Sequence, residues 1–155
     1  MMKLRAVLQL ACAAAAASRN VAGRAVVVTG GSRGLGVSIA SAFAREGVAS
    51  VCLVARSEAA LERAHASLSA EHPDVIFSYV VADVTHASDR ARIVQAAPDC
   101  NLLVNNAGIE RWGPYEGVSE ASIDEQMQVN LISPMLLTRA FIPEMLEQCD
   151  GAIVH

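Results

Sequence analysis

Residues 29–36 are Thr29-Gly30-Gly31-Ser32-Arg33-Gly34-Leu35-Gly36, a glycine-rich stretch that follows the apolar run 25–28 and precedes an amphipathic segment. The valines of the run are typical of a strand buried on both faces, and the amphipathic segment is typical of a helix. Glycines between the two allow a sharp turn that brings backbone N–H groups against an anion at the positive end of the helix. The stretch therefore predicts a phosphate-binding turn between a strand and a helix.

The spacing of the glycines separates the known kinds of phosphate-binding turn. A P-loop requires Lys followed by Ser or Thr after its last glycine, whereas Val and Ser follow Gly36 here. The dinucleotide pattern G-x-G-x-x-G does not fit either. The pattern that fits is T-G-x-x-x-G-x-G on Thr29, Gly30, Gly34 and Gly36, and it resembles the motif of the short-chain dehydrogenase/reductase family.

Composition and charge indicate one globular α/β domain. The chain has 155 residues, of which 53% are apolar and 4% aromatic, so its core is expected to be aliphatic. The net charge is -4, and the sequence has no basic patch of the kind that would indicate a nucleic-acid partner. Four cysteines and four histidines are scattered without the spacing of metal ligands. We therefore expect no metal site and reduced, mostly structural cysteines.

The first 24 residues carry basic side chains and an Ala-rich apolar run of twelve residues, Ala6 to Ala17, which is too short to span a bilayer. Three interpretations fit this segment: a secretory signal, an organelle transit peptide, or an N-terminal extension ahead of a soluble enzyme. We take the extension as the working interpretation. It predicts a cytoplasmic protein with an extension at 1–24 and a nucleotide-binding domain at 25–155.

From residue 25 onward, strand-like runs alternate with helical patterns, which is typical of β-α-β units and a parallel sheet. A long helix over 120–146, opened by a capping box from Ser122 to Glu125, precedes a last strand that starts at Ala152. We predict a Rossmann-like doubly wound parallel α/β sheet whose ligand lies beyond the carboxyl ends of the strands. The expected strands begin at residues 25, 50, 75, 102 and 152, and the expected helices cover 37–46, 58–71, 88–97 and 120–146.

Two arginines predict NADP rather than NAD as the cofactor. Arg56, followed by Ser57, ends the second expected strand, where an acid would bond the 2'-hydroxyl of NAD and a guanidinium can bind the 2'-phosphate of NADP. Arg33 in the glycine-rich turn is placed to reach the same phosphate. No acid stands at either position, so NAD is the less favoured cofactor.

A second family motif follows the fourth expected strand, where residues 105–108 are N-N-A-G. Ala107 and Gly108 have almost no side chain, so the backbone can pass close beneath the riboses of a dinucleotide. The resemblance now covers residues 25–155. It implies that Asp83, with Val84 after the third strand, contacts the adenine edge and that Asn105 steadies the central strands.

Asn130 lies on the long helix in the sequence V-N-L, a third match to the family. Ile123, Met127 and Leu131 share its helical face, which is therefore expected to pack toward the sheet. Pro134 has no N–H to donate to the Asn130 carbonyl, so that turn of the helix should open. The resemblance implies that Asn130 belongs to the catalytic site, where the matching Asn of the family holds a water in a proton relay.

The family's catalytic Tyr-x-x-x-Lys does not occur in this chain. Tyr79 and Tyr115 are followed four residues later by Asp83 and Ser119, and Lys3 is the sole lysine. A phenol near pKa 10 needs a positive neighbour to act as a base at neutral pH. We therefore expect an N-terminal part of a longer NADP-dependent oxidoreductase, which stops at the start of the fifth strand. The alternative is a non-catalytic nucleotide-binding or dimerising fragment.

The resemblance also implies a small-molecule carbonyl or alcohol substrate and a homo-oligomer formed through the helix at 120–146. Trp112 and Tyr115 are placed to face a substrate, and an incomplete parallel sheet predicts marginal stability. The residues predicted to bind the dinucleotide are Thr29, Gly30, Ser32, Arg33, Gly34, Leu35, Gly36, Arg56, Ser57, Asp83, Val84, Asn105, Ala107 and Gly108.

Overall fold

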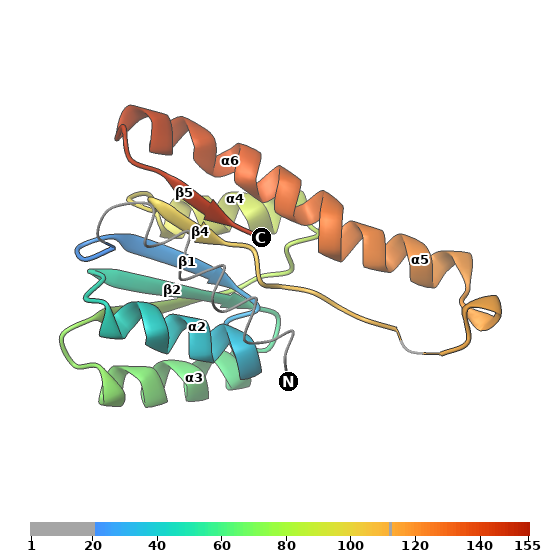
Figure 1. Ribbon diagram of the computed structural model, residues 1–155, viewed down its shortest axis with the longest axis horizontal. Coiled ribbons are helices and arrows are strands. Elements are labelled where there is room, and N and C mark those ends of the chain that lie inside the picture. Colours follow the sequence, from blue (N-terminus) through green and yellow to red (C-terminus); the bar gives the residue numbers. More distant parts are fainter. Residues whose placement is uncertain (1–20, 112) are drawn as a thin grey trace.

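Five parallel strands form one sheet in the order β3-β2-β1-β4-β5. Figure 1 labels four of them, β2, β1, β4 and β5, in this order across the sheet. The computed structural model describes residues 21–111 and 113–155. The strands are β1 (Ala25–Thr29), β2 (Ser50–Ala55), β3 (Ile76–Val81), β4 (Leu102–Val104) and β5 (Ala152–Val154). The helical segments are α2 (Gly34–Arg45), α3 (Glu58–Glu71), α4 (Ala87–Ala96), the 3₁₀ turn η1 (Tyr115–Gly117), α5 (Glu120–Met127), the π-helical η2 (Gln128–Ile132) and α6 (Ser133–Glu147).

The strand order reverses at β1, which lies between β2 and β4. From β1 the chain first builds outward through β2 and β3, and then returns to place β4 on the other side of β1. At such a reversal the loops after adjacent strands diverge and leave a crevice at the carboxyl edge of the sheet. The predicted doubly wound parallel sheet is confirmed.

The valine run of β1 separates two hydrophobic cores. Val26 and Val28 face the core that also contains residues of α2 and α3, whereas Val27 faces the core that contains residues of α4 and α6. All three valines are at most 1% exposed. Because successive side chains of a strand point to opposite faces, a continuous apolar run is what a sheet covered on both faces requires.

Two helix starts differ from the sequence prediction. Helix α2 begins at Gly34, inside the glycine-rich turn, rather than at residue 37. Helix α5 is capped by Ser119, whose hydroxyl oxygen accepts a hydrogen bond from the backbone N–H of Ser122 at 3.2 Å. The predicted capping box from Ser122 to Glu125 is therefore wrong, because Glu125 pairs with Arg111 instead.

The long helix expected over 120–146 is interrupted by the π-helical segment η2. The backbone N–H and the hydroxyl group of Ser133 both donate to the carbonyl of Gln128, the hydroxyl at 2.7 Å. Pro134 follows and cannot donate to the carbonyl of Asn130, which explains why the helix opens here. The predicted opening of this turn is confirmed.

The expectation that the face bearing Asn130 packs toward the sheet is wrong. Its neighbours Met127 and Leu131 are 48% and 44% exposed, and Figure 1 shows α5 extending beyond the end of the sheet. The sheet is instead covered by the next helix, α6, through Leu137 and Phe141, which are both 1% exposed. Helical spacing identified an apolar face but could not say which part of the long helix lies over the sheet.

The predicted N-terminal extension lies mostly in residues 1–20, outside the described residues. Of the following four, Val21 belongs to the α2–α3 core, and the buried Arg24 forms an ion pair with Asp150. Within residues 21–111 and 113–155, no helix has the length and apolar character needed to cross a membrane.

Candidate functional site

A cavity of about 860 Å³ opens at the carboxyl ends of β1 to β4, where the strand order reverses. Each loop after a strand contributes to its wall. The lining residues are Gly30, Ser32, Arg33, Gly34, Leu35, Gly36, Val54, Ala55, Arg56, Ser57, Ala60, Arg63, Ala82, Asp83, Val84, Asn106, Ala107, Gly108, Ile109 and Val129.

The glycine-rich turn shapes one wall of this cavity. Gly30 and Gly34 have φ angles of +68° and +54°, a region that side chains other than glycine rarely adopt. A Cβ on Gly36 would lie 2.2 Å from the carbonyl oxygen of Gly30, so the helix start packs directly on the turn. The N-cap residue Arg33 makes no side-chain cap, and the first turn of α2 contains no acid. Its free N–H groups and the helix dipole favour a bound anion.

Hydrogen bonds join the glycine-rich turn to the loop after β4. The Thr29 hydroxyl donates to the carbonyl of Val104 at 3.2 Å and accepts from the backbone N–H of Ala107 at 3.0 Å. The Asn106 amide donates to the carbonyl of Thr29 at 2.9 Å. The two motifs found in the sequence are therefore held together across the neighbouring strands β1 and β4.

Hydrogen bonds within the turn after β3, and between this turn and the first turn of α4, hold the turn in place. The Asp83 carboxylate accepts hydrogen bonds from the backbone N–H and the hydroxyl of Thr85 at 2.9 and 2.7 Å, and the N–H of Asp83 donates to Asp89 at 2.8 Å. Partial burial raises the pKa of Asp83, but the Thr85 hydrogen bonds and the charges of Arg56 and His86 outweigh it and lower the pKa overall. The carboxylate is therefore ionised at neutral pH and ready to accept a hydrogen bond.

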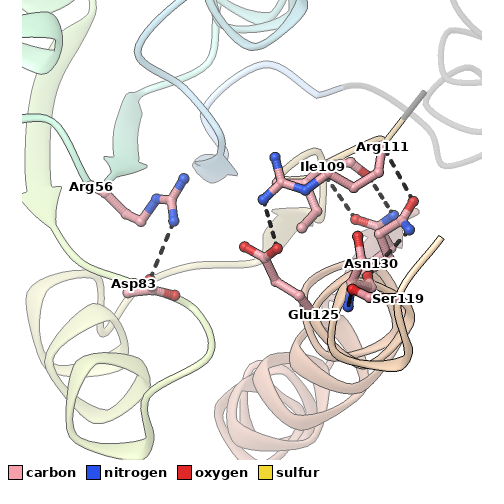
Figure 2. A network of polar contacts seen from close by, with 9 residues as sticks. Arg56, Asp83, Ile109, Arg111, Ser119, Glu125 and Asn130 are labelled. Carbon is pink, nitrogen blue, oxygen red and sulfur yellow. Dashed lines mark hydrogen bonds and ion pairs between the residues drawn. The ribbon is translucent and has the colours of Figure 1, made fainter. Parts of the chain in front are cut away.

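Both arginines singled out in the sequence line the cavity. Arg33 extends from the glycine-rich turn, and the side chain of Arg56 is 68% exposed at the end of β2. Figure 2 shows Arg56 pointing toward Asp83, with 3.7 Å between its Nη1 and the carboxylate Oδ2. No acid is adjacent to either arginine in the sequence, whereas in the fold Asp83 reaches Arg56 from the end of a different strand, β3.

Side chains of α5 and η2 hold the loop that follows Gly108, as Figure 2 shows. The Asn130 side chain accepts from the N–H of Ile109 at 2.9 Å and donates to its carbonyl at 2.8 Å. One turn earlier, Gln126 accepts from the N–H of Arg111 at 3.3 Å, and the Arg111 guanidinium pairs with Glu125 at 2.6 Å. The side-chain amide of Asn130 thus has two backbone partners in the loop.

Most of the predicted site residues line the cavity, but three do not. Thr29 is buried behind the turn, Asn105 donates to Thr138 at 3.1 Å, and Asn130 bonds the loop at Ile109. Of the two aromatic candidates, Trp112 lies outside the described residues, and Tyr115 is 79% exposed.

Sequence reasoning missed several residues of the cavity wall, chiefly Ala60, Arg63 and Asn106. Asn106 lies within the quoted N-N-A-G motif, so the motif itself was an available signal. Arg63 stands in the second turn of α3, seven residues beyond Arg56, and only the packing of that helix brings it to the cavity.

The cysteines Cys52 and Cys100 lie outside the cavity wall. Cys52 and Cys100 are buried, and burial raises the pKa of both thiols, that of Cys100 to about 12. Such thiols are poor nucleophiles. Within residues 21–111 and 113–155, no group of three or more His, Cys, Asp or Glu side chains could hold a metal ion.

A family model described as short chain dehydrogenase matches residues 24–155. The chain belongs to the short-chain dehydrogenase family. The match begins just before β1 and includes both motifs that line the cavity of this short-chain dehydrogenase.

Known proteins agree with this assignment. The short-chain dehydrogenase chain is 38% identical over 140 residues to the ketoacyl reductase HetN of Nostoc, an alignment that covers 88% of this chain and 48% of HetN. The structure of L-sorbose reductase from Gluconobacter frateurii, complexed with NADPH and L-sorbose, matches with a TM-score of 0.82 and 28% identity, covering 89% of this chain and 53% of that one. A short-chain dehydrogenase from Sphingobium yanoikuyae in complex with NADPH gives a TM-score of 0.76 and 29% identity, covering 84% and 52%.

The chain spans about half the length of the curated relatives it matches. These matches therefore align the chain with only part of each larger protein.

Proposed function

We propose that this chain is the cofactor-binding part of an NADP-dependent oxidoreductase that moves hydride between nicotinamide and a carbonyl or secondary alcohol. The observation that carries the proposal is the cavity at the strand reversal, which combines a phosphate-binding turn with Arg33 and Arg56. Two neighbours of known structure, the sorbose reductase and the Sphingobium dehydrogenase, are complexes with NADPH.

The residues present fit such a dinucleotide. The free N–H groups at the start of α2 would hold the diphosphate, and the ionised Asp83 would accept a hydrogen bond from the amino group of adenine. Ala107 and Gly108 leave the backbone after β4 open to a ribose. Arg33 follows β1, and Arg56 follows the neighbouring strand β2. Both arginines would bind the 2'-phosphate.

The dinucleotide, when bound, supplies the hydride acceptor or donor of the reaction. The chain's own contribution is to position the nicotinamide end. Asn130 sets the loop after Gly108 through its two hydrogen bonds to Ile109, and we propose that it also belongs to the catalytic site, with its backbone carbonyl available to a water. The 155 residues contain no Tyr-x-x-x-Lys, so we expect them to bind nucleotide without turning over a substrate.

The substrate proposal is limited to a small-molecule carbonyl or alcohol. It rests on the names of two matching proteins, a ketoacyl reductase aligned over 88% of this chain and an L-sorbose reductase whose structure matches with a TM-score of 0.82. We propose a cytoplasmic location on the same working interpretation of the N-terminal segment as above.

We also propose that the protein forms a homo-oligomer through the surface of α5, η2 and α6. Large apolar side chains are exposed along it, namely Met127, Leu131, Ile132, Met135, Ile142 and Leu146. Large apolar side chains exposed along one surface are typical of an interface. Light scattering of the purified chain would report a dimer, and Met135→Glu would shift it toward monomer.

The cofactor proposal is tested by titrating the purified chain with NADP⁺ and NAD⁺ in a calorimeter. We expect NADP⁺ to bind at least tenfold more tightly, and the double variant Arg33→Ala, Arg56→Ala to abolish the preference while NAD⁺ affinity is kept. Arg45→Ala is the matched control, because Arg45 is an exposed guanidinium of α2 that pairs with Glu71 away from the cavity. Equal affinity for the two dinucleotides in the unmodified chain would refute NADP dependence.

A further inference from the structure

Arg63 lines the same cavity as the two arginines already described, although it comes from a different element. Arg33 follows β1 in the glycine-rich turn, Arg56 ends β2, and Arg63 lies in the second turn of α3. Ala60, three residues before Arg63, also lines the cavity, and its small side chain leaves room in front of the helix.

The charge of Arg63 is not neutralised by the part of the chain that the structure describes. Across residues 21–111 and 113–155, the side chains of Arg63 and Arg33 form neither a hydrogen bond nor an ion pair. Arg56 meets Asp83, the only acidic residue of the cavity wall. The wall therefore carries three guanidinium groups and one carboxylate, while the chain as a whole has a net charge of -4.

The sequence of α3 also gives Arg63 no partner on its own helix. Exposed arginines on helices are commonly paired with an acid three or four residues away. At those positions, residues 59, 60, 66 and 67, the chain has Ala, Ala, Ala and Ser. The guanidinium is therefore free to face the cavity rather than being held along the helix surface.

A further donor lies beside it. Ser57 is the N-cap residue of α3, but its side chain makes no capping hydrogen bond, so its hydroxyl is available to a ligand. The positive end of the α3 dipole adds to the potential at this end of the cavity. Arg56, Ser57 and Arg63 thus line the cavity from the segment that follows β2, and Arg33 lines it from the turn after the neighbouring strand β1.

We propose that Arg63 is a specificity-determining residue that binds the ribose 2'-phosphate of the dinucleotide together with Arg33 and Arg56. This inference rests on the NADP-dependent function proposed above. A phosphate monoester carries close to two negative charges at neutral pH and can accept hydrogen bonds from several guanidinium groups at once. Arg63 contacts the phosphate and not the adenine or the nicotinamide, so it selects between NADP and NAD without affecting the rest of the binding site.

The test is calorimetric titration of the whole chain and of Arg63→Ala with four probes: NADP⁺, NAD⁺, 2',5'-ADP and 5'-AMP. Loss of one charge-assisted hydrogen bond predicts about tenfold weaker binding of NADP⁺ and 2',5'-ADP, with NAD⁺ and 5'-AMP unchanged. Arg63→Lys keeps the charge but loses the planar guanidinium group, so its affinity for NADP⁺ should lie between that of the unmodified chain and that of Arg63→Ala. Raising the salt concentration should reduce the difference between chain and variant.

The matched control is Arg139→Ala, which removes the same charge from an exposed position of α6 outside the cavity wall. A thermal melt of each variant checks that the fold is retained, and a purely structural role of Arg63 would lower the melting temperature without changing the ratio of NADP⁺ to NAD⁺ affinity.

The outcomes separate the inference from the function on which it rests. If the unmodified chain prefers NADP⁺ and Arg63→Ala behaves like Arg139→Ala, the role of Arg63 is refuted and NADP dependence stands. If the unmodified chain binds neither dinucleotide, or binds both equally, the proposed function fails and the inference fails with it. A selective loss of affinity for the two 2'-phosphorylated probes supports both.

Discussion

Replacing Gly36 by alanine tests whether the glycine-rich turn works by close backbone packing or only by conformational freedom. The Cβ of Gly36→Ala would lie 2.2 Å from the carbonyl oxygen of Gly30 and 2.9 Å from the Cα of Gly31, both backbone atoms. Gly30 is itself tightly surrounded, because Asn106 Nδ2 and Ala107 Cα lie 2.8 and 3.0 Å from the position that a Cβ on Gly30 would take. The turn can accept the methyl group only by moving away from α2.

Gly34→Ala is the matched comparison, since it adds the same methyl group two residues earlier. Apart from its chain neighbours and the backbone of its own helix, no atom lies within 4 Å of the Cβ position of Gly34, but its φ of +54° is unfavourable for alanine. The expected cost of Gly34→Ala is therefore the left-handed conformation alone, about 1 kcal/mol. Gly36→Ala forces an overlap between backbone atoms and is expected to cost about 3 kcal/mol, the upper part of the range for overpacking, which is more than a hundredfold in the unfolding equilibrium.

Urea unfolding followed by circular dichroism measures both costs, and titration with NADP⁺ measures the effect on the site. Gly36→Ala should abolish binding, because the free N–H groups at the start of α2 no longer converge on the phosphate. Gly34→Ala should retain the fold with weaker binding. Equal destabilisation by the two substitutions, or unchanged NADP⁺ affinity in Gly36→Ala, would refute the argument from close packing.

Three further outcomes follow from the hydrogen bonds around the site. Thr29→Val removes the hydroxyl that joins the ends of β1 and β4 and takes away the partner of the partly buried backbone N–H of Ala107, so urea unfolding should show a loss of about 1 kcal/mol that Thr29→Ser largely restores. The pKa of Asp83 is lowered in the folded state below its ordinary value of 3.8, so its stabilising effect is present above about pH 4 and is lost as the pH falls through the folded pKa. Asp83→Asn should therefore unfold with a weaker pH dependence in acid melts, and an identical acid profile would contradict this. Asn130→Leu removes both hydrogen bonds to Ile109 and should speed amide hydrogen exchange in residues 109–111, while exchange in β1 stays the same.

Local patterns were sufficient to predict the family, the parallel sheet and most of the residues that line the cavity. The glycine spacing over 29–36 and the N-N-A-G motif depend on backbone geometry within a few residues, so both can be recognised in the sequence without knowledge of tertiary contacts. The opening of the helix at Pro134 was equally predictable, because a missing N–H acts on its own turn.

Such local patterns do not predict the contacts between segments that are far apart in the sequence. Asp83 and Arg56 come from different strands, the partner of Asn130 is a loop 21 residues away, and Arg63 reaches the cavity because α3 packs beside β2 and β3. Helical periodicity placed Asn130 on an apolar face, yet α5 extends past the sheet and leaves that face exposed. Sequence motifs reflect what the backbone requires over a few residues. The pairing of charges and the burial of a helix face depend instead on how whole helices and strands pack against one another, which only the tertiary structure decides.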